Sequence, residues 1–199
     1  MITAILLASG YSRRMHTDKL LLDFHGLPVI ARVMNAISSC PFDQKILIQR
    51  TDAYTELAHK YGFQPYQNHS AQEGQSSSVR CGVSHSQPSS ALMFFVGDQP
   101  CLTAKTIERL LKTHQEYPDD IIVPALDGQF KNPVIFAPQF QTWLSNTQGD
   151  QGGRTIIKKF AEHVRTVTFH DTDTFHDIDT IEDYEFMLSS ASSIFPHSF

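Results

Sequence analysis

Three cations follow the first apolar run of the chain. Residues 6–19 read LLASGYSRRMHTDK, so Arg13, Arg14 and Lys19 fall within seven residues, directly after a stretch of small residues. Small residues let backbone N–H groups approach a ligand closely, and cations beside such a cradle suit a polyphosphate. The spacing matches neither GxxxxGK[ST] nor GxGxxG, so an ordinary turn with solvated basic residues remains an alternative.

Carboxylates that suit a divalent cation occur at two further places. Asp98 directly follows the apolar run 91–96, and Asp177 and Asp179 lie two residues apart before a helical pattern. Side chains two apart in an extended stretch share a face, and Mg²⁺ takes one or two carboxylates together with phosphate oxygens and water. Asp98 is therefore a candidate metal ligand, and Asp177 or Asp179 is a candidate for a second one. For Asp179, capping of the last helix is the alternative role.

Short apolar runs alternate with amphipathic patterns along the chain. Strands are expected at 3–8, 45–49, 63–67, 91–96, 120–125, 134–137 and 164–169, and helices at 27–38, 52–61, 76–84, 103–115, 156–161 and 180–188. This rhythm indicates parallel pairing with right-handed crossovers. We predict an α/β fold: a three-layer α/β/α, doubly wound, mostly parallel, Rossmann-like sheet. Ligands of such sheets bind at the carboxyl ends of the strands, which brings the basic loop and Asp98 to one edge.

Composition limits the class of protein. The 199 residues, 41% of them hydrophobic, suit a single domain over 1–189, with a poorly ordered tail expected at 190–199. The net charge of −5 excludes a basic footprint for nucleic acid. Neither a secretory signal nor an apolar run of the ~20 residues that cross a bilayer is present, so no membrane partner is expected. Three widely spaced cysteines indicate a cytoplasmic location.

The basic loop also resembles the signature of the MobA-like nucleotidyltransferases, LAxGxSxRMGxxK followed by Gly-x-Pro, which here is Gly26-Leu27-Pro28. Five further blocks resemble that family in the same order, so that the likeness spans residues 3–187; they are EGQSSS at 73–78, GDQP at 97–100, NPVIF at 132–136, GDQGGR at 149–154 and DIDTIED at 177–183. The resemblance implies a nucleotidyltransferase fold, Mg²⁺ as cofactor, and attack of an acceptor phosphate on the α-phosphate of a nucleoside triphosphate.

Within this family the likeness is greatest to the molybdenum cofactor cytidylyltransferases. The Ser-rich turn at 74–78 and the side chain of Ser9 stand where guanylyltransferase relatives usually carry other residues, and they leave less room for a purine. The resemblance therefore implies CTP and a molybdopterin-type cofactor as substrates, and a molybdoenzyme that receives the product. Use of GTP, another phosphate acceptor, or a non-catalytic cofactor-binding accessory role are the alternatives.

The resemblance also implies roles for individual residues. It places the stretch 177–179 near the metal held by Asp98, so that Asp98 and Asp177 are the expected metal ligands. Arg14, Lys19 and Asp98 are expected to be catalytic, through charge neutralisation at the triphosphate and its metal. Ser76 and Ser77 would hydrogen-bond the base, with helix capping as the alternative. The residues expected to bind the nucleotide are Leu7, Ala8, Ser9, Gly10, Lys19, Asn68, Gly74, Ser76, Ser77 and Asp98.

Two residues depart from the family pattern. His16 stands where the family has a glycine after Arg-Met, and Lys131 stands where it has a glycine before Asn-Pro. The first would alter the phosphate grip, and the second would add a charge near the acceptor. Asp150 and Arg154 are expected to flank the acceptor phosphate or to form a salt bridge that orders their loop.

Overall fold

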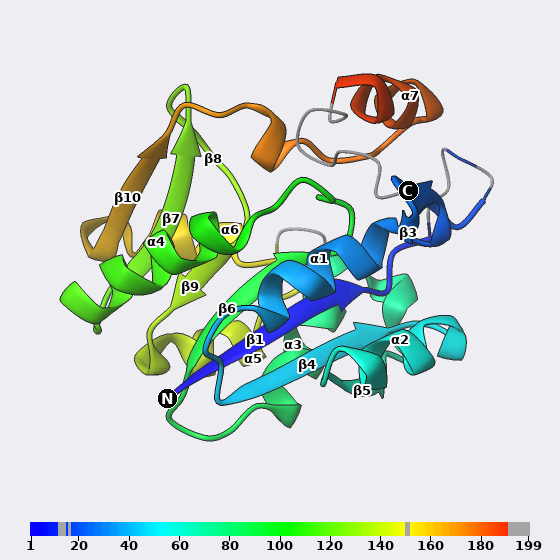
Figure 1. Cartoon of the computed structure of the whole chain (residues 1–199). Helices are drawn as coiled ribbons and strands as arrows, with labels where there is room; N and C mark the ends of the chain where they lie inside the picture. Colours follow the sequence, from blue (N-terminus) through cyan, green and yellow to red (C-terminus); the bar gives the residue numbers. More distant parts are fainter. Residues whose placement is uncertain (12–14, 16, 150–151, 191–199) are drawn as a thin grey trace.

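The computed structural model describes residues 1–11, 15, 17–149 and 152–190, which form one eight-stranded sheet with helices on both faces (Figure 1). The strands are β1 (Ile2–Ala8), β4 (Gln44–Gln49), β5 (Gln64–Gln67), β6 (Ala91–Val96), β7 (Ile121–Leu126), β8 (Gln129–Phe130), β9 (Val134–Phe136) and β10 (Val164–Phe169). The helices are α1 (Val29–Ser38), α2 (Thr55–Lys60), α3 (Gln75–His85), α4 (Ala104–Glu116), α5 (Gln141–Ser145), α6 (Arg154–Lys159) and α7 (Ile181–Ser190). A separate hairpin pairs β2 (Asp23–Phe24) with β3 (Leu27–Pro28).

The strand order β10-β7-β9-β6-β1-β4-β5 confirms the predicted doubly wound, mostly parallel sheet. β1 lies at the centre and pairs in parallel with both β4 and β6. The chain passes from β1 outward to β4 and β5, and then returns to the other side of β1 as β6. This reversal creates a switch point at the carboxyl ends of β1 and β6, where ligands of open α/β sheets bind.

The strand β9 of the main sheet runs antiparallel to its neighbours. It pairs antiparallel with both β6 and β7, a reversal that the alternating rhythm of the sequence does not predict. The chain leaves β7 through Asp127 and Gly128, which both have positive φ (50° and 75°), and it returns directly as β8. An Asp-Gly pair of this kind favours a tight hairpin over a helical crossover, so the returning segment arrives antiparallel.

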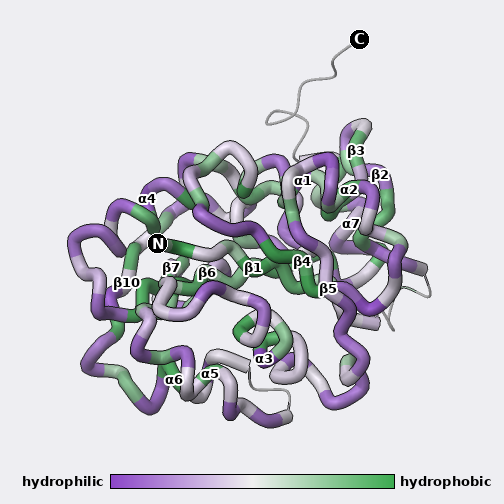
Figure 2. Tube along the Cα trace, turned by 90° about the horizontal axis from the view of Figure 1, so that it is seen from below, coloured by the Kyte–Doolittle hydropathy of each residue, from purple (hydrophilic) through white to green (hydrophobic). Residues whose placement is uncertain are grey.

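Side chains alternate between the two faces of the sheet. On β1, Ala4, Leu6 and Ala8 belong to one apolar cluster, and Ile5 belongs to the other. Figure 2 shows the strands edge-on, with α1, α2 and α4 on one side and α3, α5 and α6 on the other. None of the described helices has the length and apolar character needed to cross a membrane.

The last helix, α7, returns to the start of the chain. A capping box precedes it: Thr180 Oγ1 accepts a hydrogen bond from the Asp183 backbone (3.2 Å), and the Asp183 carboxylate accepts one from the Thr180 backbone (2.8 Å). The Tyr184 hydroxyl donates to the carbonyl of Asp23. Just before the helix, the Ile178 backbone N–H donates to the Asp98 carbonyl (3.0 Å), so the closing segment lies against the end of β6.

Gly82 tests how closely α3 packs on the sheet. A Cβ at this position would lie 2.6 Å from Ile5 Cγ2, which is fully buried in β1. Gly82→Ala should lower the free energy of unfolding by about 1–3 kcal/mol through overpacking, in spite of a helix-propensity gain of at most ~1 kcal/mol. Urea unfolding measures this, with exposed Ser84→Ala on the same helix as the control. Unchanged stability of Gly82→Ala would contradict the close packing.

Candidate functional site

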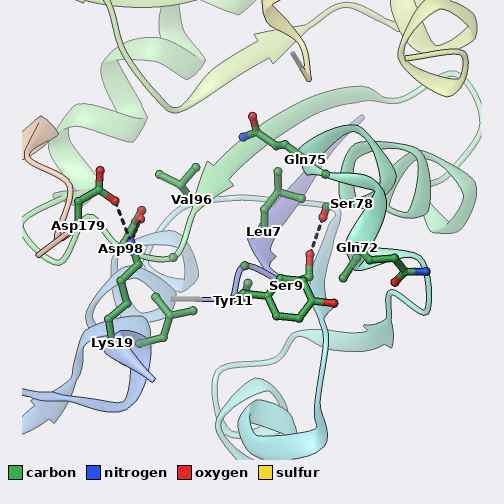
Figure 3. Close-up of a pocket in the computed structure, with 16 residues that line it drawn as sticks. Leu7, Ser9, Tyr11, Lys19, Gln72, Gln75, Ser78, Val96, Asp98 and Asp179 are labelled. Carbon is green, nitrogen blue, oxygen red and sulfur yellow. Dashed lines mark hydrogen bonds and ion pairs between the residues drawn. The ribbon is translucent and has the colours of Figure 1, made fainter. Parts of the chain in front are cut away.

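A cavity of about 510 Å³ opens at the switch point between β1 and β6 (Figure 3). It is bounded by the end of β1 and the loop after it, by the turn that leads into α3, by the end of β6, and by the closing segment before α7. The residues that line it are Leu7, Ala8, Ser9, Gly10, Tyr11, Lys19, Leu20, Ala71, Gln72, Gly74, Gln75, Ser78, Val96, Gly97, Asp98 and Asp179. Four segments that are far apart in the sequence therefore meet at one site.

The ammonium group of Lys19 is the centre of charge in this cavity. It donates to the Asp98 carboxylate (2.7 Å), the Asp179 carboxylate (3.2 Å) and the Ile178 carbonyl (2.6 Å). Burial alone would lower the pKa of Lys19, but the two carboxylates outweigh it and raise the pKa above its usual value. Lys19 is therefore a fixed positive charge at neutral pH, held by three oxygen atoms.

The backbone around Lys19 is fixed by its neighbours. Lys19 begins a short 3₁₀ turn, Lys19–Leu21, and the Asp18 side chain caps it by accepting from the Leu20 N–H (3.2 Å). The Tyr54 hydroxyl in turn donates to Asp18. Leu20 packs onto Gly97, where a Cβ would lie 3.2 Å from a Leu20 methyl group. Gly97 thus lets the turn approach β6 closely enough for Lys19 to reach Asp98.

Three acidic side chains surround this position, and they differ in what they face. Asp98 and Asp179 line the cavity, whereas Asp177 does not: its carboxylate accepts a hydrogen bond from Gln99 Nε2 (2.8 Å). Asp177 is an exposed residue as a whole. Partial burial of its carboxyl group, followed by the charge of Asp98, raises the pKa of that group to about 6. The sequence pattern favoured Asp177 over Asp179 as the second ligand, but the placement in the cavity favours Asp179.

The acidic cluster fits a divalent cation that shares its coordination with a substrate. Among the described residues, no group of three or more His, Cys, Asp and Glu side chains could hold a metal ion. Mg²⁺ seldom needs such a cage, because it takes one or two carboxylates and completes its shell with phosphate oxygens and water. The carboxylate oxygen atoms of Asp98 and Asp179 already hold the Lys19 ammonium in the cavity. They are the acidic oxygen atoms there that could bind a metal ion.

Hydroxyl and amide groups line the opposite end of the cavity. The hydroxyl groups of Ser9 and Ser78 are hydrogen-bonded to each other across the gap between β1 and α3 (Figure 3). Asn68 lies behind them; its Nδ2 donates to Ser78 Oγ at 3.1 Å and to Ser9 Oγ at 3.5 Å. Asn68 is buried and does not line the cavity, so the expected direct contact with ribose or base is replaced by support of Ser9 and Ser78.

Ser76 and Ser77 also lie away from the cavity, contrary to the expected contact with the base. Ser76 Oγ accepts a hydrogen bond from Arg80 (3.1 Å), and Ser77 Oγ donates to the Gly74 carbonyl (2.8 Å). The reason is helical geometry. Successive residues of a helix point about 100° apart, so of three consecutive serines only one can face a given side. Gln75 and Ser78, three residues apart, share the face that lines the cavity.

A second cavity of about 90 Å³ adjoins the first, with Leu7, Gln75 and Val96 common to both. Apolar side chains from β6, β9, α3 and α6 form part of its walls, together with polar groups. Lys131, Asn132 and Arg154 supply its polar rim. The expected partner of Arg154, Asp150, lies outside the described residues. Arg13, Arg14 and His16 lie outside them too, so their expected roles stay predictions.

Arg80 is a connecting residue that the sequence patterns do not single out. One of its terminal nitrogens donates to the Thr147 carbonyl (2.7 Å) and to Ser76 Oγ, and the other pairs with the Glu73 carboxylate (2.6 Å). The guanidinium thus joins the turn that precedes α3 to the loop that leads toward Arg154. Arg80 follows Ser76 by four residues on the expected helix, and this spacing predicts a contact between the two side chains. The spacing does not predict the contact with Thr147, which is distant in the sequence.

The comparisons with known proteins agree with this geometry. Residues 4–166 match the MobA-like NTP transferase domain. The chain belongs to this family. Among its relatives, the purine catabolism protein PucB of Bacillus subtilis is 25% identical over 168 residues, or 79% of this chain and 80% of PucB. A probable molybdenum cofactor guanylyltransferase of Natranaerobius thermophilus is 26% identical over 131 residues, or 65% of this chain and 63% of that protein.

Solved structures share the fold of this MobA-like domain. A manganese complex of Rv0371C from Mycobacterium tuberculosis has a TM-score of 0.78 at 22% identity, covering 95% of this chain and 98% of that one. A nucleotidyl transferase from Methanothermobacter, Mth528, has a TM-score of 0.80 at 19% identity, covering 95% and 96% of the two chains. Both likenesses extend over nearly the whole chain, so the fold is shared beyond the residues that form the cavity.

Arg80 should act through the two segments that it joins. In Arg80→Gln, the charged hydrogen bond from α3 to the Thr147 loop is lost. One charge-assisted contact of this kind is worth about 1.5–3 kcal/mol, so we expect kcat/KM to fall by at least ~10-fold. The affinity for nucleotide alone should change little. Steady-state kinetics and nucleotide titration measure the two quantities. Arg80→Lys should restore part of the loss. Equal losses of nucleotide affinity and turnover would argue against this role.

Proposed function

We propose that this protein is a Mg²⁺-dependent nucleotidyltransferase that joins CMP from CTP to the phosphate of a molybdopterin-type cofactor and releases pyrophosphate. The observation that carries the proposal is the Lys19–Asp98–Asp179 cluster in the large cavity at the switch point. The positive charge of the lysine suits the phosphate oxygens of a metal-bound triphosphate, and the two carboxylates suit its metal ion. Membership of the MobA-like family and the guanylyltransferase relative support this class of chemistry.

In the proposed reaction, the triphosphate lies along the loop after β1. Its oxygen atoms accept hydrogen bonds from the Lys19 ammonium in place of Asp98 and Asp179. The carboxylates of Asp98 and Asp179 would then hold a divalent cation, which would supply positive charge to the phosphates and to the departing pyrophosphate. Arg14, from the same loop in the sequence, is proposed to add a second positive charge at the α-phosphate.

The acceptor needs little help with proton transfer. A phosphate monoester has its second pKa near 6, so it is mostly a dianion at pH 7 and can attack without a general base. Its oxygen forms a new bond to the α-phosphorus while the bond from that phosphorus to the bridging oxygen of the β-phosphate breaks, and pyrophosphate leaves with the electron pair. The protein contributes position and charge, which account for most of the catalysis in such transfers.

The acceptor is proposed to occupy the second cavity. That cavity shares Leu7, Gln75 and Val96 with the first, so a group bound in one lies next to a group bound in the other. Its walls combine apolar and polar groups, which suits part of a heterocyclic body, and Arg154 at its rim suits a phosphate. Gln75, which faces both cavities, is placed at the junction where the two phosphates would meet.

The base is proposed to lie at the end of the large cavity that Ser9, Gln75 and Ser78 line. The side chain of Ser9 takes space that a purine would need, which favours cytosine. GTP is the second candidate, because one relative carries the name of a guanylyltransferase. Pyrophosphate release with CTP, GTP, ATP and UTP, each with molybdopterin as acceptor, tests the function and separates these nucleotides; no release with any of the four would contradict it.

Asp98→Asn should reduce turnover by at least ~10²-fold, because the variant keeps the shape of the side chain but loses the charge that holds the metal. Pyrophosphate release under saturating CTP and Mg²⁺ measures this. Exposed Asp119→Asn makes the same chemical change away from the cavity and should leave the rate unchanged. A normal rate for Asp98→Asn, with an unchanged melting temperature, would exclude the metal role.

Ser9→Gly should shift the preference from CTP toward GTP. Removing this side chain makes room for the larger base and removes a hydroxyl group from the cytosine site, a combination worth about 1–3 kcal/mol, or at least ~5-fold in the ratio of kcat/KM values. The control is Ser89→Gly, an exposed serine with φ of 62°, outside the cavity. A parent that already prefers GTP would favour the second candidate, and an unmoved ratio would show that Ser9 does not discriminate between bases.

A further inference from the structure

Two cations of the second cavity have no counter-charge in the described part of the chain. Lys131 and Arg154 both line this cavity, and the side chain of neither forms an ion pair or a hydrogen bond with a described residue. The other basic residues that line cavities are neutralised, since Lys19 is paired with Asp98 and Arg80 with Glu73. In a protein of net charge −5, two cations without described partners at one small cavity point to an anionic ligand.

Apolar side chains line part of the same cavity as these cations. The walls include Val79, Val96, Phe94, Val134, Phe136 and Ile157. The rings of Phe94 and Phe136 meet edge to face with centroids 6.0 Å apart. Ligand sites combine apolar contacts of this kind with polar groups that fix the orientation of the ligand.

The fold fixes the backbone at both cations. The Lys131 N–H donates to the Pro124 carbonyl of β7 (2.9 Å), which anchors the link between β8 and β9. Arg154 begins α6 directly after Gly153, where a Cβ would lie 2.7 Å from the Phe136 ring. The two side chains therefore start from separate, rigid positions on the wall of the same cavity, and each can hold its own anionic group.

The two cations differ in their relation to the nucleotide. Arg154 follows a loop that touches the turn before α3, since a Cβ at Gly152 would lie 3.1 Å from the Gln75 side chain. Gln75 lines the nucleotide cavity as well. Lys131 comes from the β8–β9 link, which lines the second cavity only. Arg154 is thus the cation next to the attacking phosphate of the acceptor, and Lys131 is left for another group of the same ligand.

We propose that the acceptor carries a second anionic group besides the phosphate that attacks, and that Lys131 binds this group. The inference rests on the proposed function and narrows its substrate class to monophosphates that carry an additional negative charge. Lys131 is in this view a specificity-determining residue: it selects among acceptors, whereas Lys19 and Asp98 act on the nucleotide whichever acceptor is bound.

Two probe molecules test the second charge directly. Phenyl phosphate and 4-carboxyphenyl phosphate share a ring and a phosphate, and only the latter has a second anionic group. Calorimetric titration of the full chain, with Mg²⁺ and a non-hydrolysable CTP analogue present, should give at least ~5-fold tighter binding of the carboxylated probe. Lys131→Gln should remove that advantage and Lys131→Arg should keep it. Lys158→Gln, an exposed lysine on α6 outside the cavities, should leave it unchanged.

Equal affinity of the two probes for the parent protein, binding of neither probe, or an advantage that persists in Lys131→Gln would each overturn the proposal. Binding of the CTP analogue is measured separately in the same titrations, before either probe is added. Failure of the analogue to bind would contradict the proposed function, whereas normal analogue binding without a carboxylate advantage would contradict only the role of Lys131. A melting curve for each variant confirms that it is folded.

Discussion

The contact of the Lys19 ammonium with Asp98, Asp179 and the Ile178 carbonyl is the interaction on which the architecture of the site depends. It joins the loop after β1 to the end of β6 and to the segment before α7, which lie 79 and 160 residues further along the sequence. The sheet brings the first two segments together at the switch point, and the backbone bond from Ile178 to Asp98 brings the third. Without Lys19, the carboxylates there would repel one another.

The same contact prepares the site for an anion and a metal ion together. In the free protein the Lys19 ammonium and the carboxylates neutralise each other. The free-energy cost of an unpaired, partly buried charge is therefore avoided. A metal-bound triphosphate offers each group a new partner of the correct sign. The turn before α3 and the second cavity complete the arrangement, because Gln75 contacts the space on both sides of the point where the two substrates would react.

Sequence patterns predict the layers of the fold and the edge of the sheet that carries the site, because apolar periodicity and strand ends are local properties. They do not predict the reversal of β9, because a strand's direction depends on the whole connection before it, although Asp127-Gly128 is a hairpin signal. Leu7, Ser9, Lys19, Gly74 and Asp98, which are expected to bind the nucleotide, line the large cavity. Asn68 lies behind Ser9 and Ser78, and Ser76 and Ser77 lie away from the cavity. That distinction depends on the rotation of α3 and on long-range partners such as Thr147, which composition and spacing do not encode.

The exchange of the Lys19–Asp98 contact for a triphosphate and its metal is the step on which the proposed function depends most. A crystal structure of the protein with Mg²⁺ and a non-hydrolysable CTP analogue tests it most directly. We expect the Lys19 ammonium within hydrogen-bonding distance of a phosphate oxygen, an Asp98 carboxylate oxygen coordinated to the metal, and the base beside Ser9. A bound triphosphate elsewhere, with Lys19 still paired to Asp98, would contradict the exchange.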